Sequence, residues 1–258
     1  MGLDIYAGTL TRYYAQNWKT VTQQYAEEQG WTFQRITPNG PAEPEEKMDP
    51  AEIQADMESW RDQILAMILS GTERQYTPWQ ENNEKPYYTD KPDWDAFGAL
   101  LVYAAAVLQE KELPPVVKKN WDFNNHPLIL GLLEDGERVQ SWSLFQGVTW
   151  WLPIEDSFYF QAPLPTGDTM TIATTGLLMA ELKRINELGW KADDDTILSW
   201  SKSEGYPADM ETAADGTVNK TAEHNQYDTE SLAKFAFSIM WQAAGFSMEQ
   251  GVPLLMDY

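Results

Sequence analysis

Aromatic and acidic residues gather between positions 142 and 160, and together they have the chemistry of a sugar site. Trp142, Trp150 and Trp151 offer flat apolar surfaces, and Glu155 and Asp156 follow closely. Glycoside hydrolysis needs two carboxyl groups that flank the scissile bond, with the sugar held between them. These residues therefore predict a cleft in which paired carboxylates act on a carbohydrate or a similar polar ligand.

The same aromatic residues have two other interpretations. Large aromatic side chains commonly fill the core of an α+β domain, and exposed ones commonly anchor a protein partner. Trp150 and Trp151 are neighbours, so in a strand they point to opposite faces. We expect only one of them in the core, with the other exposed or covered by a loop.

A second polar segment, residues 121–127, collects a carboxylate, two amides and an imidazole before a proline. Asp122 and His126 could form a general base and the acid that orients it. The alternative is a hydrogen-bonded turn, in which Asn and Asp side chains bind backbone groups and the proline fixes the exit. The residue types favour the turn.

Asp4 lies between two aliphatic residues at the start of the chain, in an alternating pattern typical of a strand. If its carboxylate faces inward it needs a partner, because a lone buried charge is unstable. Arg12 is the nearest cation in sequence. We expect a structural salt bridge between the two, with a ligand-binding pair as the alternative.

Composition excludes several other chemistries. The chain has no cysteine and only two histidines, so disulfides, thiolate nucleophiles and cysteine-based zinc sites are absent. The sequence has no phosphate-binding glycine loop, no nucleophile elbow and no His-Glu-x-x-His motif. The acidic run at residues 193–195 is interpreted as a solvated turn. We predict neither a metal nor a cofactor.

The net charge of −22, from 40 acidic and 18 basic side chains, argues against binding to nucleic acid. Acidic residues occur in both halves of the chain, which is typical of a solvated surface and also suits a basic protein partner. The first residues lack the basic and apolar regions of a signal peptide, and no apolar run is long enough to span a bilayer. We expect a cytoplasmic protein with no membrane association.

Elements and turn signals indicate the fold class. Helices are expected at about 16–28, from residue 50 to Gly71, from Pro92 to 108, at 175–188, and from Asp228 to Gly245. Strands are expected at 3–7, 158–161, 169–172 and 252–256, and the two middle strands form a hairpin. Because helices and strands do not alternate, we predict an α+β fold with several amphipathic helices packed on a mixed or antiparallel sheet with a central hairpin. We expect one domain over residues 1–258, with a soft boundary near 115–135 between a helix-rich and a strand-rich half.

The opening Met1-Gly2-Leu3-Asp4-Ile5-Tyr6 and the residues after it, to Tyr14, resemble the start of a group of uncharacterised bacterial proteins. That resemblance implies no activity. The pattern from Trp151-Leu152-Pro153 through the hairpin to Gly189-Trp190 is similar in style to small bacterial immunity proteins.

Two hypotheses follow from these observations. The first is a non-enzymatic protein-binding protein, of the immunity or inhibitor kind, with an acidic and aromatic surface for a basic protein. The second is a hydrolase that uses paired carboxylates on a carbohydrate or similar ligand. A pocket that holds two carboxylates about 5–10 Å apart is the feature that separates them.

Overall fold

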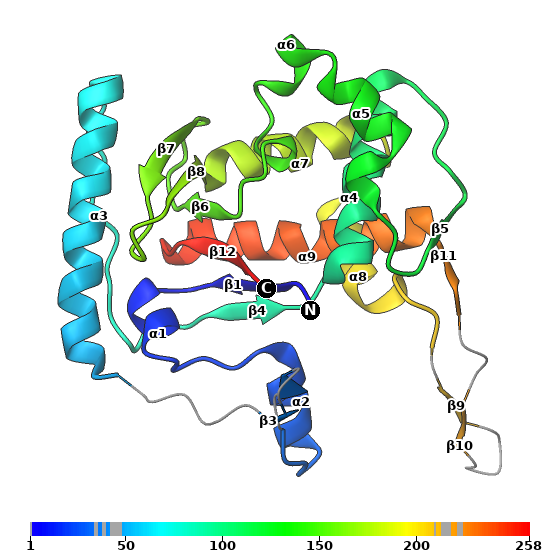
Figure 1. Ribbon diagram of the computed structural model, residues 1–258, viewed down its shortest axis with the longest axis horizontal. Coiled ribbons are helices and arrows are strands. Elements are labelled where there is room, and N and C mark those ends of the chain that lie inside the picture. The colour runs from blue at the N-terminus through cyan, green and yellow to red at the C-terminus, as the bar shows by residue number, and fades with distance from the viewer. Residues whose placement is uncertain are drawn as a thin grey trace.

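The first and last strands of the chain pair with each other inside one six-stranded mixed sheet (Figure 1). The computed structural model describes residues 2–33, 36–37, 40–41, 48–208, 210–212, 218–220 and 224–258. In sheet order the strands are β4 (Tyr88–Asp90), β1 (Asp4–Ala7), β12 (Leu254–Asp257), β6 (Trp150–Leu152), β8 (Thr169–Thr174) and β7 (Tyr159–Pro163). Neighbours are antiparallel except β6 and β8, which are parallel. The α+β class is confirmed. The hairpin of β7 and β8 comes from the middle of the chain and forms one edge of the sheet.

Helices cover both faces of this sheet. They are α1 (Leu10–Tyr14), α2 (Val21–Glu28), α3 (Pro50–Thr72), α4 (Asp93–Gln109), α5 (Pro127–Leu133), α6 (Gly136–Val139), α7 (Thr175–Leu188), α8 (Asp194–Ser203) and α9 (Thr229–Gln250), with 3-10 turns η1 (Phe123–Asn125) and η2 (Ser143–Phe145). Three short strand pairs lie outside the main sheet: β2 (Ile36–Thr37) with β3 (Gly40–Pro41), β5 (Val116–Lys118) with β11 (Gln226–Asp228), and β9 (Met210–Thr212) with β10 (Val218–Lys220).

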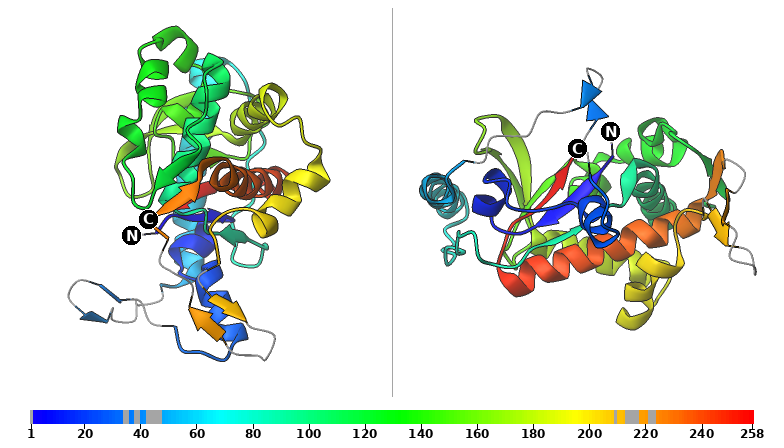
Figure 2. Two further views of the ribbon diagram at one scale, coloured as in Figure 1. Left: turned by 90° about the vertical axis from the view of Figure 1, so that its right-hand side faces the viewer. Right: turned by 90° about the horizontal axis from the view of Figure 1, so that it is seen from below.

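Side-chain alternation divides the interior into two cores, one on each face of the sheet. In β1, Ile5 packs into the core that α4, α5, α7, α8 and α9 build, and Tyr6 packs into the core of α1 and α3. In β12, Leu254 and Leu255 divide in the same way. Figures 1 and 2 show α9 running along one face of the sheet, with α3 standing apart from it on the other side of the strands. Figures 1 and 2 also show α2 and the β9–β10 pair projecting from the body.

The helix signals predict the long helices well. The Asp49 side chain accepts from the Ala51 N–H at the start of α3, and Asp228 accepts from the Ser231 N–H at the start of α9. The expected apolar face of α3 is buried, from Ile53 to Ile68. The expected end of α9 at Gly245 is wrong, because the helix continues to Gln250 and ends at Gly251, whose φ of 58° is left-handed.

Strand β4 lies in a segment without a clear period, and α8 begins at the acidic run 193–195, where a solvated turn was expected. Asp193 caps α8 by accepting from the Thr196 N–H at 2.9 Å, and the next two carboxylates lie in the first turn, where the helix dipole favours negative charge. The expected helix over 16–28 begins only at Val21, after a capping box between Thr20 and Gln23.

Each core also contains one buried glutamate. Glu181 of α7 accepts from the Ser143 hydroxyl at 2.9 Å, from the Leu144 N–H at 3.2 Å and from the Ser143 N–H. Glu81, in the other core, accepts from the Thr11 N–H and hydroxyl and from the Trp79 indole N–H. Burial raises the pKa of both carboxyl groups against the effect of these donors, and it raises that of Glu181 to about 7.

Candidate functional site

The expected sugar cleft around Trp150 and Trp151 does not form. Both indoles are buried, on opposite faces of the sheet, so the expectation that only one is core is wrong. Helix α3 covers Trp150, whose ring lies 6.1 Å from that of Trp60. Trp151 donates its indole N–H to the Ser143 hydroxyl at 3.1 Å, and Trp142 is buried in the same core. The three tryptophans are therefore structural, as the core interpretation has it.

The two acidic residues after them are not a catalytic pair. Asp156 accepts from Arg74 at 2.9 Å and from the Tyr76 hydroxyl at 2.5 Å, and these hydrogen bonds lower its pKa. The side chain of Glu155 is exposed, and its backbone carbonyl lies against Gly176 at the start of α7. Asp156 fixes the connection between β6 and β7 to the segment that follows α3.

Asp122 and His126 form a turn. His126 is the N-cap of α5: its Nδ1 accepts from the Leu128 N–H at 3.3 Å, and Pro127 takes the first helical position. Asp122 accepts from the Asn125 amide at 2.6 Å, and no hydrogen bond joins these two described side chains, Asp122 and His126. Burial lowers the pKa of His126. The general-base alternative lacks its orienting hydrogen bond.

Asp4 and Arg12 do not pair, because Asp4 opens β1 whereas Arg12 lies in α1, beyond the far end of that strand. The Arg12 guanidinium donates to the carbonyls of Asn17, at 2.8 Å, and Asn83, and it lies 5.2 Å from the centre of the Tyr87 ring. Burial raises the pKa of Asp4; the positive charge of Lys91 opposes this, and Asp257 adds to it. The role of Arg12 is to hold the segment 82–87 against α1.

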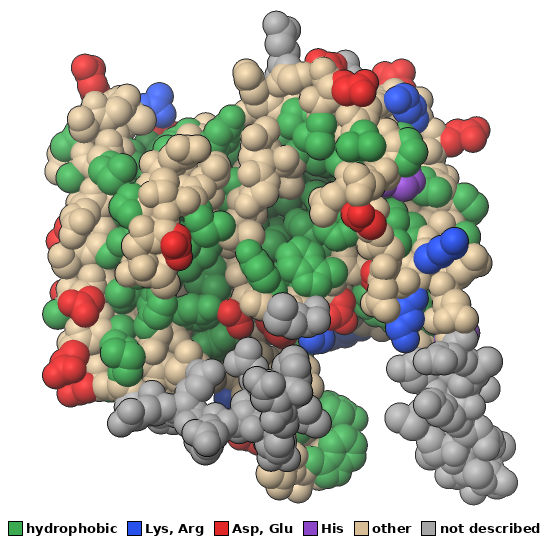
Figure 3. Space-filling view, in the orientation of Figure 1, with side chains coloured by type: hydrophobic (Ala, Val, Ile, Leu, Met, Phe, Trp, Pro, Cys, Tyr) green, Lys and Arg blue, Asp and Glu red, His purple; other side chains and the backbone are tan. Residues whose placement is uncertain are grey.

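A cavity of about 600 Å³ lies elsewhere, at the start of α4. Its walls come from four separate segments, and its aromatic members are Trp94, Trp121, Tyr206 and Tyr227. Trp94 stacks on Phe123 with ring centres 6.4 Å apart, and Tyr206 meets Tyr227 edge-on at 5.0 Å. We call this cavity the acidic-aromatic cleft. Figure 3 shows hydrophobic side chains gathered on the face between α4 and β5, with charged side chains around them.

The polar groups of the cleft are Asp93, Asp95, Lys119 and Asn120. Asp95 Oδ2 accepts from the Asn120 N–H at 2.9 Å, and Asp93 Oδ1 lies 3.5 Å from Lys91 Nζ. The other oxygens of these carboxylates, Asp93 Oδ2 and Asp95 Oδ1, accept no hydrogen bond from any residue that the structure describes. Each of these two lining carboxylates therefore keeps one oxygen that no described residue engages.

Backbone conformation marks the same place. Six described residues other than glycine have a positive φ, and four of them, Gln16, Glu73, Glu110 and Lys191, lie just after helix ends, where this conformation is common. The remaining two, Asp93 with 57° and Asn120 with 56°, both line the cleft. Unusual backbone conformations concentrate at binding sites, where the surrounding structure holds them.

The Tyr206 hydroxyl links the two sides of the cleft. The Ala96 N–H, in the first turn of α4, is hydrogen-bonded to this hydroxyl. Burial raises the pKa of Tyr206, and the negative charges of Asp93 and Asp95 raise it further. The hydroxyl therefore stays protonated.

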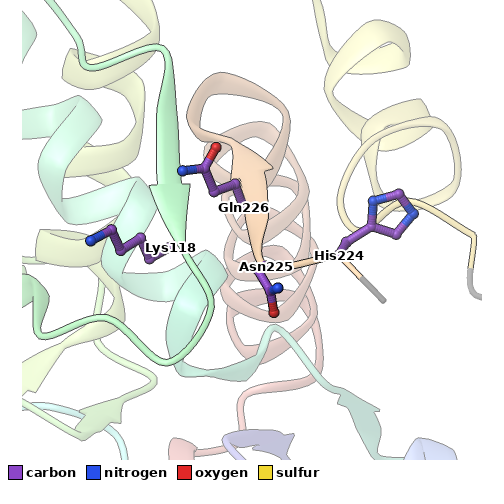
Figure 4. Close-up of a pocket in the computed structure, with 4 residues that line it drawn as sticks. All are labelled: Lys118, His224, Asn225 and Gln226. Atoms are coloured by element: carbon purple, nitrogen blue, oxygen red, sulfur yellow. The ribbon is translucent and has the colours of Figure 1, made fainter. Parts of the chain in front are cut away.

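A smaller cavity of about 390 Å³ adjoins the β5–β11 pair and is lined by Lys118, His224, Asn225 and Gln226. Figure 4 shows these four side chains pointing in different directions, with Lys118 and His224 on opposite sides of the strands. They present no converging set of groups to a ligand. Within the described ranges, no three carboxylate or imidazole side chains are arranged to hold a metal ion, and no helix is long and apolar enough to cross a membrane.

One signal for the cleft is visible in the sequence. Asp93, Trp94 and Asp95 follow a proline at a helix start, so two carboxylates flank an indole there. The other walls, near 120, 206 and 227, join them only through tertiary packing.

Comparison with known proteins does not add a family: the chain matches no protein-family model, no curated protein and no solved structure.

Proposed function

We propose that this is a non-enzymatic protein-binding protein of the immunity or inhibitor kind, which acts in the bacterial cytoplasm on a basic protein. The observation that carries the proposal is the acidic-aromatic cleft, in which four aromatic residues surround two carboxylates that keep acceptor oxygens. A cation over an aromatic ring gains about 0.5–2 kcal/mol, and nearby carboxylates add to that attraction. The cleft therefore suits a cationic side chain of a partner.

Charge supports a basic partner. The chain carries a net −22, and complementary charge raises the rate at which two proteins meet. Tryptophan and tyrosine are the residues that most often dominate binding energy at protein interfaces. A cavity of about 600 Å³ has room for a side chain together with its neighbours along a peptide.

The arrangement of the carboxylates favours binding over glycoside hydrolysis. Asp93 and Asp95 both belong to the first turn of α4 and both line the cleft. A glycosidase needs its two carboxyl groups on either side of the scissile bond. The lining also includes no histidine and no serine.

A pull-down from the native host tests the proposal, with the wild-type protein and the Trp121→Ala variant as immobilised baits. Trp31→Ala is the matched control, because Trp31 is 62% exposed and lies outside the cleft. We expect a basic protein to be recovered by wild type and Trp31→Ala, in amounts that fall with added salt, and to be lost with Trp121→Ala. Circular dichroism checks that both variants are folded.

Recovery of no partner, or of acidic proteins alone, contradicts the proposal. Equal recovery by Trp121→Ala shows that the partner binds another surface.

A further inference from the structure

We infer that the acidic-aromatic cleft binds the guanidinium group of an arginine side chain and selects arginine over lysine. The inference rests on the proposed function, and it names the chemical group through which the partner enters the cleft.

The first argument is the number of unengaged acceptors. Asp93 Oδ2 and Asp95 Oδ1 belong to different side chains, and each carboxylate already has one oxygen engaged within the protein. A guanidinium carries five N–H donors in a planar fork, so it can donate to two separate acceptors at once. An ammonium group concentrates its three donors around one atom and suits a single acceptor.

The second argument is the shape of the walls. Trp94 is half-buried and is held by Phe123, at 6.4 Å with an angle of 20° between the rings. Trp121 is also half-buried, and its indole N–H donates to the Asp95 carbonyl at 3.4 Å. Fixed indole rings favour a flat, weakly hydrated cation, which can stack on them, over a compact and strongly hydrated one.

The third argument is that lysine has little to gain here. Asp93 already has an ammonium beside it, that of Lys91, and Lys119 lines the same cleft. A lysine from the partner would repeat an interaction that the protein makes for itself in a partly exposed position, where ion pairs contribute little. Arginine adds stacking and a second hydrogen-bonded carboxylate.

Calorimetric titration of the full chain with three capped peptides tests the inference. The peptides share the sequence Gly-Ser-X-Ser-Gly, with arginine, lysine or citrulline at X. Citrulline keeps the length and flat end of arginine but has no charge. We expect the arginine peptide to bind at least about tenfold more tightly than the lysine peptide, and citrulline to bind more weakly than either.

Two variants connect the preference to the cleft. Asp95→Asn keeps an oxygen for the Asn120 N–H but loses the charge, so the arginine peptide should weaken by about tenfold and the lysine peptide by less. Asp122→Asn is the control, because Asp122 is an exposed aspartate outside the cleft lining, and it should leave both affinities unchanged.

Equal affinities for the arginine and lysine peptides overturn the inference and leave the proposed function standing, because the cleft would then respond to charge alone. Equal affinities for arginine and citrulline also overturn it, because the cleft would then respond to shape. If none of the peptides binds, the inference fails, and the pull-down decides the proposed function separately.

Discussion

The buried carboxyl group of Glu181 should make the protein less stable as the pH rises. Its pKa is about 7 in the folded protein, against 4.5 for an ordinary glutamate. Between these values the folded state holds a proton that the unfolded state has released, so the free energy of unfolding falls with pH. One pKa unit corresponds to about 1.4 kcal/mol, so the whole contribution is about 3 kcal/mol. It is complete below pH 4.5 and lost above pH 7.

Urea unfolding followed by tryptophan fluorescence measures this effect, at pH values from 5.5 to 8, where about 2 kcal/mol of the contribution should disappear. Glu81, Asp4 and Asp90 also have raised pKa values, so they too make the free energy of unfolding fall as the pH rises. The comparison must therefore be made with Glu181→Gln, which cannot titrate at this position. The variant should be less stable than wild type at pH 5.5, because its amide nitrogen faces groups that donate. The difference in free energy of unfolding between wild type and Glu181→Gln should become about 2 kcal/mol smaller by pH 8.

Glu187→Gln is the control, because it makes the same change of charge on the exposed side of α7. It should follow wild type at every pH. If wild type and Glu181→Gln lose stability in parallel, Glu181 is ionised throughout the range. The three donors would then outweigh burial, and the reasoning is refuted.

Two further predictions concern packing. A Cβ at Gly176 would collide with the Glu155 carbonyl oxygen, so Gly176→Ala should lower the free energy of unfolding by about 3 kcal/mol or more. The control Gly71→Ala, in open space on α3, should raise the free energy of unfolding by about 0.5–1 kcal/mol. The same loss of stability in both variants would contradict the collision. Trp60 donates its indole N–H to the Pro163 carbonyl at 2.8 Å, so Trp60→Phe should lower the free energy of unfolding in urea by about 1–3 kcal/mol. The control Trp31→Phe should not change it measurably, because Trp31 is exposed. A Trp60→Phe protein as stable as wild type would show that this hydrogen bond contributes nothing to stability.

Local signals were sufficient for most of the fold. Asp49 and Asp228 start their helices because each places an acceptor oxygen over free backbone N–H groups, which depends only on neighbours in sequence. The hairpin of β7 and β8 follows from alternation and a glycine turn in the same way. The predictions of burial that were wrong concern residues whose burial depends on contacts with distant parts of the chain. Trp150 is covered because α3, some ninety residues earlier in the chain, packs on its face of the sheet.

The candidate site could not be predicted to the same degree. The cluster at 142–156 gathers the residue types that a sugar site uses, but strand geometry sends its indoles to opposite faces, and both are buried. The acidic-aromatic cleft joins residues near 94, 120, 206 and 227, and no sequence period connects them. Asp93 and Asn120 stand out only once their backbone angles are known.

The position of β12 sets the order in which the chain can fold during synthesis. This strand lies between β1 and β6 in the sheet, yet it is the latest of the strands to leave the ribosome. At about 5–20 residues per second, β1 waits roughly 10–50 s for that neighbour. Until then β1 and β6 each present an open edge of unpaired backbone groups, which other chains can bind. A chain arrested before β12 is made should therefore associate through these two edges more readily than the finished protein.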